Sequence, residues 1–445
     1  MKTKRTRRPA KRKSRPSRSN ATVLRQLVEL IPPNLVPKLA RELGIDAIAR
    51  TFSAWSHVVT MLYAQVSRAV GLNDVCDALS FHISDLFAMR GATAPRRNTL
   101  SHANKTRDHA LAQKLYWSVF EHLKARWPRF ARGTRPKRLW RMHRAVHAVD
   151  STTVQLVLNC IDWARHRTRK AAAKIHMRIN LSSFLPGFAI VESAGEHDSV
   201  RAPELCAGLK EGEVALFDKA YVHFKHLFAL SARGVFFVTR EKTNLKTRRK
   251  KKLPPHADKR ILRDELILLS GKDTSRDYPQ VLRRVTALVE IDGKEREMIF
   301  LTNNLEWSPV TICELYRSRW QIEVFFKQLK QTVQLVDFLG NSANAVKWQI
   351  WTALLVHLLL RFLAWQSGWW HSFSRLLNNV RATLWTRFDL VEMLSRYGTA
   401  GAVYRNDEAA TQGWLRGFEP GLWDSMRVER GDESTNRCKL AKSAQ

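Results

Sequence analysis

The sequence lacks paired cysteines. The five that it contains are scattered, with no C-x-x-C pair and no nearby Cys/His cluster: Cys76, Cys160, Cys206, Cys313 and Cys438. This spacing excludes a disulfide framework, argues against a structural zinc site and fits a reducing cytosol. No apolar stretch follows the basic N-terminus, so no secretory signal peptide is predicted.

Long hydrophobic runs are also missing. The strongest candidate, IWTALLVHLLL at residues 350–360, contains His357 and is closed by Arg361 after eleven residues. A helix that spans a bilayer needs about 20 apolar residues. The segment therefore predicts a buried helix in a protein without a membrane anchor.

Acidic residues are scarce relative to basic ones. The chain of 445 residues has 75 Lys and Arg against 40 Asp and Glu, which gives a net charge of +35. This excess favours a polyanionic partner, because phosphate neutralisation supplies affinity that does not depend on base sequence. Nucleic acid is the favoured partner, and an anionic membrane surface is the weaker alternative.

The beginning of the chain is the most basic part. The first twenty residues contain ten Lys or Arg and no acid. Such a run cannot collapse, so residues 1–20 are predicted to form a disordered basic arm. The arm serves either as a non-specific DNA clamp or as a solubilising tail.

Residues 21–135 have apolar side chains at helical spacing, which predicts an all-α N-terminal domain. A loop with Gly91 and Pro95 separates two of its helices, in the manner of a DNA-reading helix pair. An ordinary basic surface face is the alternative. The candidate DNA contacts are the basic residues of the second helix: Arg96, Arg97, Lys105 and Arg107.

The pattern changes at about residue 136. Strand-like runs around Asp150, at residues 174–183 and at residues 187–198, precede alternating helices and strands. Residues 136–371 are therefore predicted to form an α/β domain with a mixed sheet, and residues 244–303 a basic, β-rich insertion in it. Residues 372–445 are predicted to be helical, with dimerisation as a candidate role.

Two acids stand at the ends of strand-like segments. Asp150 follows the apolar run of a predicted strand, and Asp218 follows VALF and precedes a predicted helix. An ionised carboxylate in such a place is costly unless a cation pairs with it, and chemistry in open α/β sheets collects at the carboxyl ends of strands. A turn or helix-cap role is the alternative for each acid taken alone.

The segment YRSRWQIEVFFKQLK brings a third acid. On a continuous helix Tyr316, Arg319, Glu323 and Lys330 occupy one stripe about 60° wide, at about 100° per residue. Ile322, Phe325 and Leu329 fall on the opposite side and predict the core-facing stripe. A solvated face with an Arg319–Glu323 ion pair would look similar, but such a face rarely includes a tyrosine.

The spacing Tyr316-x2-Arg319-x3-Glu323-x6-Lys330 matches the YREK signature of bacterial insertion-sequence DDE transposases of the family numbered IS-four. The segments HAVDSTTVQL and LFDKAY around the two aspartates resemble that family as well. The resemblance extends from about Leu24 to about Leu363. It implies an RNase H-like catalytic core with a β-rich insertion between the second aspartate and the glutamate.

The resemblance assigns Asp150, Asp218 and Glu323 as catalytic metal ligands. It places Arg319 and Lys330 on DNA phosphates near the cleaved end, with Tyr316 beside them. Relatives proceed through a DNA hairpin with a flipped base, on which Trp320 or Trp163 would stack, although a core role is the more favoured prediction for both. His147, His176 and His197 lie near the acids in sequence and are predicted to be structural.

Three converging carboxylates would repel one another without a cation. Two Mg²⁺ ions suit such all-oxygen ligands, with Mn²⁺ as a substitute. The predicted function is cut-and-paste transposition, in which the ends are cleaved and the freed 3′-hydroxyl is transferred into target DNA. The predicted partners are double-stranded DNA, as terminal inverted repeats and as target, and a second copy in a synaptic homodimer.

Two other functions share these residues. One is an RNase H-like nuclease that cleaves without joining, and the other is a catalytically inactive DNA-binding derivative. Only the reaction products distinguish them from a transposase. In each case a cytoplasmic protein associated with the bacterial nucleoid is expected.

Overall fold

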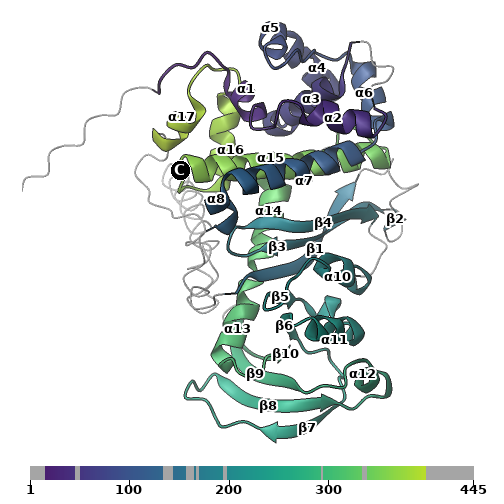
Figure 1. Cartoon of the computed structure of the whole chain (residues 1–445), viewed down its shortest axis with the longest axis vertical. Helices are drawn as coiled ribbons and strands as arrows, with labels where there is room; N and C mark the ends of the chain where they lie inside the picture. The colour runs from purple at the N-terminus through teal and green to yellow at the C-terminus, as the bar shows by residue number, and fades with distance from the viewer. Residues whose placement is uncertain are drawn as a thin grey trace, which may run out of the picture. The chain divides into compact units, whose positions relative to one another are not determined.

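The computed structural model describes residues 16–45, 51–133, 144–156, 165–166, 170–193, 198–291, 294–332 and 338–396. Most of the predicted basic arm, Trp163, His197 and residues 397–445 lie outside this part of the chain. The contacts divide the described residues into two compact units. One consists of residues 16–119 and 351–396, and the other of residues 120–350 (Figure 1).

The first unit is helical, as the sequence predicts. Its helices are α1 (Val23–Val28), α2 (Leu35–Glu42), α3 (Ala54–Ser67), α4 (Leu72–Ser80), α5 (Ile83–Phe87), α6 (Arg97–Thr106), the first part of α7 (Ala110–Arg126), most of α15 (Ala343–Gln366), α16 (Phe373–Ala382) and α17 (Leu390–Arg396). Helix α3 is buried from Ala54 to Val66. A helix that is apolar on nearly every side is stable only where other helices surround it.

The helices after residue 371 complete this N-terminal unit. The side chain of Gln26 donates to the carbonyl of Phe388 at 2.6 Å and accepts from the backbone N–H of Leu390 at 2.9 Å. Arg18 and Phe388 form an antiparallel bridge. The expected domain boundaries at residues 135 and 371 stay predictions, and these contacts, which join segments more than 360 positions apart, place residues 388–390 in the same compact unit as the N-terminal helices.

The apolar run at residues 350–360 lies within α15, which is 24 residues long. Helix α15 is long enough and apolar enough to cross a membrane, but 83% of its most apolar stretch is buried inside the protein. It is the only such helix among the described residues. This agrees with the predicted buried helix, although the helix is longer than the apolar run.

The second unit contains a ten-stranded mixed sheet with helices on it. The strands are β1 (Val146–Leu156), β2 (Arg165–His166), β3 (Lys170–Asn180), β4 (Leu185–Ser193), β5 (Val214–Phe217), β6 (Phe236–Arg240), β7 (Thr247–Lys252), β8 (Ile261–Leu269), β9 (Leu282–Ile291) and β10 (Lys294–Thr302). The helical segments are the end of α7, α8 (Pro128–Arg132), α10 (Asp198–Cys206), the turn η2 (Lys219–Tyr221), α11 (Phe224–Ala232), α12 (Lys272–Asp277), α13 (Pro309–Ser318), α14 (Gln321–Lys327), the π-turn η3 (Gln328–Thr332) and the start of α15.

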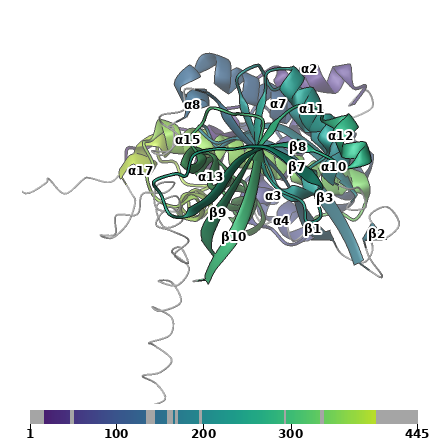
Figure 2. The ribbon, with the colours of Figure 1, turned by 90° about the horizontal axis from the view of Figure 1, so that it is seen from below.

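The sheet confirms the predicted α/β class. Strand β1 pairs with β3 in antiparallel fashion and with β5 in parallel, and β5 pairs in parallel with β6. This is the strand arrangement of an RNase H-like core, with β4 beyond β3. Helices α10, α11 and α12 lie on one side of the sheet and α13 on the other (Figures 1 and 2).

The predicted β-rich insertion extends the same sheet. Strand β10 pairs with β6, and β9, β8 and β7 follow in order toward the edge. A buried ion pair fastens β8 to β9: the Arg283 guanidinium contacts both carboxylate oxygens of Asp264, at 2.8 and 2.6 Å. Arg283 also donates to the carbonyls of Leu305 and Trp307, just before α13. The insertion therefore positions the helix that follows it.

Replacing Arg283 tests this connection. We expect Arg283→Met to lower the free energy of unfolding by about 3–5 kcal/mol, because it leaves the Asp264 carboxylate buried without its cation. Arg283→Met combined with Asp264→Leu should recover most of the loss. Urea denaturation measures both, with the exposed Arg263→Met on β8 as the control. A loss no larger than that of the control would show that the pair does not stabilise the insertion.

The helical unit has a pH-sensitive contact between α3 and α6. His57 is buried and its Nε2 lies 2.8 Å from Asn104 Oδ1. Burial, and to a smaller extent the charge of Arg107, lower the pKa of His57 to about 3, whereas the Asn104 contact opposes this. At a pH below 6.5, the ordinary pKa of histidine, the unfolded chain therefore binds a proton at His57 that the folded chain does not bind.

Stability contributed by neutral His57 should therefore be lost as the pH falls from about 6.5 toward 3. At pH 5 the loss from this group should be about 2 kcal/mol. Thermal unfolding at pH 7.5 and pH 5 would show a smaller pH effect in His57→Gln than in the wild type. The exposed His102→Gln on α6 is the control and should keep the full effect. Equal pH effects in all three proteins would contradict the assignment.

Candidate functional site

Asp150 and Asp218 lie on neighbouring parallel strands. The register pairs Val149 with Phe217, so each acid comes one residue after a paired position. Strands in a sheet lie about 4.8 Å apart, and in-register residues point to the same face. Val149 and Phe217 pack in the core beneath α10 and α11, which directs the two acids to the opposite face, on the side of α13.

Helices α13 and α14 bring three further side chains to that face. Arg319 Nη1 lies 2.6 Å from Asp150 Oδ2, and Arg319 Nη2 lies 2.8 Å from Glu323 Oε1. The Tyr316 hydroxyl donates to Asp218 Oδ1 at 3.3 Å. One guanidinium therefore bridges two of the predicted acids, and the predicted tyrosine contacts the third.

The start of α13 is set by its local sequence. Ser308 is the N-cap, its side chain accepts from Thr311 N, and Pro309 is the first helical residue. On the core side, Ile322, Phe325 and Leu329 are fully buried, as predicted. These residues anchor the segment against the sheet and fix which side chains reach Asp150.

The expected continuous helix is wrong at two places. Arg319 and Trp320 interrupt it, and residues 328–332 form a π-turn. Around the interruption the N–H groups of Ile322 and Glu323 donate to carbonyls three residues earlier, at 3.0 and 2.9 Å. The chain contains no Pro or Gly between residues 310 and 339 that would announce either feature. Arg319 and Trp320 keep helical backbone angles, so the chain is locally tightened there and Arg319 still pairs with Glu323 four residues on.

The charges at this site are strongly coupled. Burial raises the pKa of Asp150 to about 6, and nearby Glu323 and Asp218 raise it further, against the opposing effect of the Arg319 guanidinium. Burial also raises the pKa of Glu323 and raises that of Tyr316 to about 12. The acids therefore form a region of negative charge that a single arginine compensates only in part.

The donor set suits a hard divalent cation, since three carboxylates offer only oxygen ligands. Among the described residues, however, no three His, Cys, Asp or Glu side chains are gathered closely enough to form a ready-made metal site. Arg319 lies between Asp150 and Glu323 instead. An ion bound by both acids would take the place of the guanidinium.

A second polar group on the other face of β1 was missed by the sequence analysis. Ser151 donates to Asp198 Oδ1 at 2.6 Å, and Lys174 Nζ lies 3.0 Å from the same oxygen. His176 is fully buried and lies 3.0 Å from Glu192 Oε1, as expected for a structural histidine. Polar residues at every second position of β3, namely Lys174, His176 and Arg178, were the available signal.

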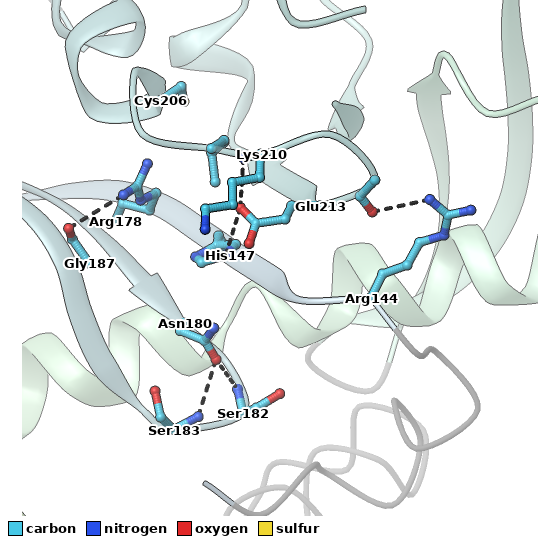
Figure 3. Close-up of polar contacts among 12 residues, drawn as sticks. Arg144, His147, Arg178, Asn180, Ser182, Ser183, Gly187, Cys206, Lys210 and Glu213 are labelled. Carbon is cyan, nitrogen blue, oxygen red and sulfur yellow. Dashed lines mark hydrogen bonds and ion pairs between the residues drawn. The ribbon is translucent and has the colours of Figure 1, made fainter. Parts of the chain in front are cut away.

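The same buried face continues toward the beginning of β1. Figure 3 shows His147 facing Glu213, with Nε2 and Oε2 3.5 Å apart, beside Arg178. Arg178 is 7% exposed, and within the described structure its Nε and Nη1 have no hydrogen-bond partner. A Cβ atom at Gly187 would lie 3.2 Å from Arg178 Nε, so the glycine leaves room for the guanidinium. These groups lie on the face opposite Asp150.

The other predicted contacts are distributed as follows. Lys330 is half-buried in the π-turn, and no described contact joins it to the three acids. Trp320 is 41% exposed, so the core role favoured for it is wrong. In the helical unit, Arg96, Arg97 and Lys105 are exposed on or beside α6. Arg107 instead donates to the carbonyls of Phe52 and Ser53 at the start of α3.

Comparisons with known proteins agree with this architecture. Residues 142–359 match the family model described as a transposase DDE domain. Residues 19–89 match a domain of unknown function, DUF4372. The first match covers β1, β5, α13 and α14, and thus all three predicted acids.

Several curated transposases are similar to the chain. A putative transposase, y4zB, of Sinorhizobium fredii is 31% identical over 48% of this chain, which spans 60% of that relative's length. A probable transposase for the insertion sequence element IS5377 of Geobacillus stearothermophilus is 25% identical over 74% of this chain and 84% of its own. A putative transposase for the element IS4SA of Synechocystis is 24% identical over 62% and 73%, respectively.

A solved structure is similar over most of the chain at 10% identity. It is the piggyBac transposase synaptic complex with hairpin DNA, with a TM-score of 0.44 over 87% of this chain and 84% of that one. The family match and the curated relatives carry the assignment. The chain belongs to the bacterial insertion-sequence transposases with a DDE domain.

Proposed function

We propose that the chain catalyses cut-and-paste DNA transposition, with Asp150, Asp218 and Glu323 as the ligands of two Mg²⁺ ions. The observation that carries the proposal is that each aspartate directly follows one member of the paired residues Val149 and Phe217, while Arg319 links Glu323 to Asp150. The spacing of Tyr316, Arg319, Glu323 and Lys330 supports membership of the IS-four family. When bound, Mg²⁺ or Mn²⁺ would lower the pKa of an attacking water and stabilise the leaving 3′-oxygen.

The side chains of the chain itself divide the remaining tasks. In the absence of metal, Arg319 holds Asp150 and Glu323 in place. When metal ions pair with these two acids, the Arg319 guanidinium is free to bind a DNA phosphate. Tyr316 orients the Asp218 carboxylate through its hydroxyl. Phe325 and Leu329, both fully buried, hold the helix that carries Glu323. Lys330 contacts a DNA phosphate near the cleaved end, and the exposed cations of α6 bind DNA as well.

The partners follow from this function. The substrate is double-stranded DNA, as terminal inverted repeats and target, and two copies of the chain hold the two ends in a synaptic complex. The net charge of +35 supports a nucleic-acid partner. A protein acting on chromosomal DNA of a bacterium works in the cytoplasm, at the nucleoid.

Conservative substitution of the acids tests the proposal. Asp150→Asn, Asp218→Asn and Glu323→Gln should each reduce cleavage of the transposon end below about 1% of wild type, because each removes a carboxylate that the ions require. Binding of the end should be retained. The assay uses the inverted repeats that flank the gene, with Mg²⁺, and follows both cleavage and joining. Asp273→Asn on α12, where the side chain is 77% exposed, is the control.

Near-normal cleavage by any one of the three variants would remove that residue from the ligand set. Cleavage by the wild type without any joined product would instead favour a nuclease that does not transfer strands.

Replacing Arg319 tests the electrostatic coupling without metal or DNA. We expect Arg319→Gln to raise the pKa of Asp150 above its value of about 6, because the positive charge of Arg319 opposes the raising effect of burial and of the other acids. Carboxyl ¹³C NMR of metal-free protein measures this midpoint. Arg317→Gln, two residues earlier on α13, is the control and should leave the midpoint in place. An unchanged midpoint in Arg319→Gln would show that the guanidinium does not stabilise the Asp150 carboxylate.

A further inference from the structure

Strand β7 is a run of cations at the edge of the sheet. Residues 248–252, RRKKK, are all exposed. Within the described part of the chain β7 pairs only with β8, so its other edge is open. A bulge at Lys250, between Arg249 and Lys251, breaks the simple alternation of side chains along the strand. Because successive residues of a strand point to opposite faces, these five consecutive cations lie on both faces of the sheet.

The acids of this part of the sheet lie further inside. Asp264 pairs with buried Arg283, and Glu265 pairs with Arg284 at 2.7 Å. Glu265 also lies 3.3 Å from Arg249, whose side chain is 61% exposed. Among the described residues no ion pair involves Arg248, Lys250, Lys251 or Lys252. The positive charge of the inner strands is therefore compensated, whereas that of β7 is largely not.

We propose that β7 binds the sugar-phosphate backbone of double-stranded DNA without reading its base sequence; this inference rests on the proposed function. Five successive cations on one strand repel one another, and a row of phosphates relieves that repulsion while releasing counterions. Basic residues on an edge strand also prevent sheets from joining edge to edge. Protection of the edge works with charge of either sign, whereas DNA binding needs positive charge. Reversing the charge of β7 therefore separates the two explanations.

The position of β7 fixes where on the DNA the contact would fall. From β5, which ends one residue before Asp218, the sheet continues through β6, β10, β9 and β8 to β7. Five steps between strands of about 4.8 Å give on the order of 24 Å. At 3.4 Å per base pair this is about seven base pairs. A duplex with its end at the acids and its axis across the strands would therefore meet β7 about seven base pairs away.

The test reverses three charges at once. The variant Lys250→Glu/Lys251→Glu/Lys252→Glu keeps the edge strand charged. If the cations of β7 serve only to prevent aggregation, this variant should therefore bind DNA as the wild type does. The matched control, Lys225→Glu/Lys272→Glu/Arg276→Glu, makes the same change of net charge on exposed positions of α11 and α12. Full-length proteins are titrated without metal against a 40-base-pair duplex with the inverted repeat and against a scrambled duplex.

We expect the β7 variant to bind both duplexes more weakly by a similar factor. The slope of log K against log salt concentration should become shallower by about 3, because about 0.9 counterion is released per phosphate contact. Ethylation interference on the repeat should lose its signal about seven base pairs from the cleaved phosphate. The α11/α12 control should keep a nearly wild-type slope, and all three proteins should remain equally soluble.

Three results would overturn the inference: an unchanged slope in the β7 variant, an equal loss in the control, or tighter wild-type binding to a duplex RNA or an anionic vesicle than to DNA. Cleavage by the wild type is measured separately with Mg²⁺. Failure to cleave, with the slope change intact, would count against the proposed function and leave the β7 surface standing. Normal cleavage with an unchanged slope would count against the β7 surface alone.

Discussion

The contact on which the site depends is one guanidinium between two carboxylates. Asp150 and Glu323 come from a strand and a helix far apart in the sequence, and both lie in an environment that disfavours their charge. Arg319 contacts each of them at less than 3 Å. It therefore lets acids that would repel one another stay close in the absence of another cation. Under the proposed function, a divalent cation would replace the guanidinium between these acids, and Arg319 would then pair with a DNA phosphate.

Two parts of the fold form this contact: the parallel strands β1 and β5, and the α13–α14 segment that packs against them. The parallel register of β1 and β5 sets Asp150 beside Asp218 on one face of the sheet. Arg319, between α13 and α14, reaches Asp150, while buried Phe325 and Leu329 hold the following turn in place. The inserted strands contribute through Arg283, which ties β8 and β9 to the loop just before α13. The insertion thus supports the helix that faces Asp150 and Asp218, and it also extends the sheet toward β7.

Much of this architecture follows from local sequence patterns. A helix follows Asp218 as predicted, a Ser308 cap and Pro309 begin α13, and the predicted apolar stripe of Ile322, Phe325 and Leu329 is buried. Features that depend on distant contacts could not be predicted. The break at Trp320 has no Pro or Gly to mark it, and the link from Gln26 to Phe388 joins opposite ends of the described chain. The buried charges of β3 resemble an exposed polar face until α10 covers them.

The most direct measurement is a crystal structure of the full chain with Mn²⁺ and a pre-cleaved duplex end, with anomalous data collected at the manganese edge. We expect manganese peaks bonded to oxygens of Asp150, Asp218 and Glu323, with the Arg319 guanidinium moved from between the acids toward the DNA. Manganese held elsewhere, or Arg319 still bridging Asp150 and Glu323 with the DNA end in place, would contradict this expectation.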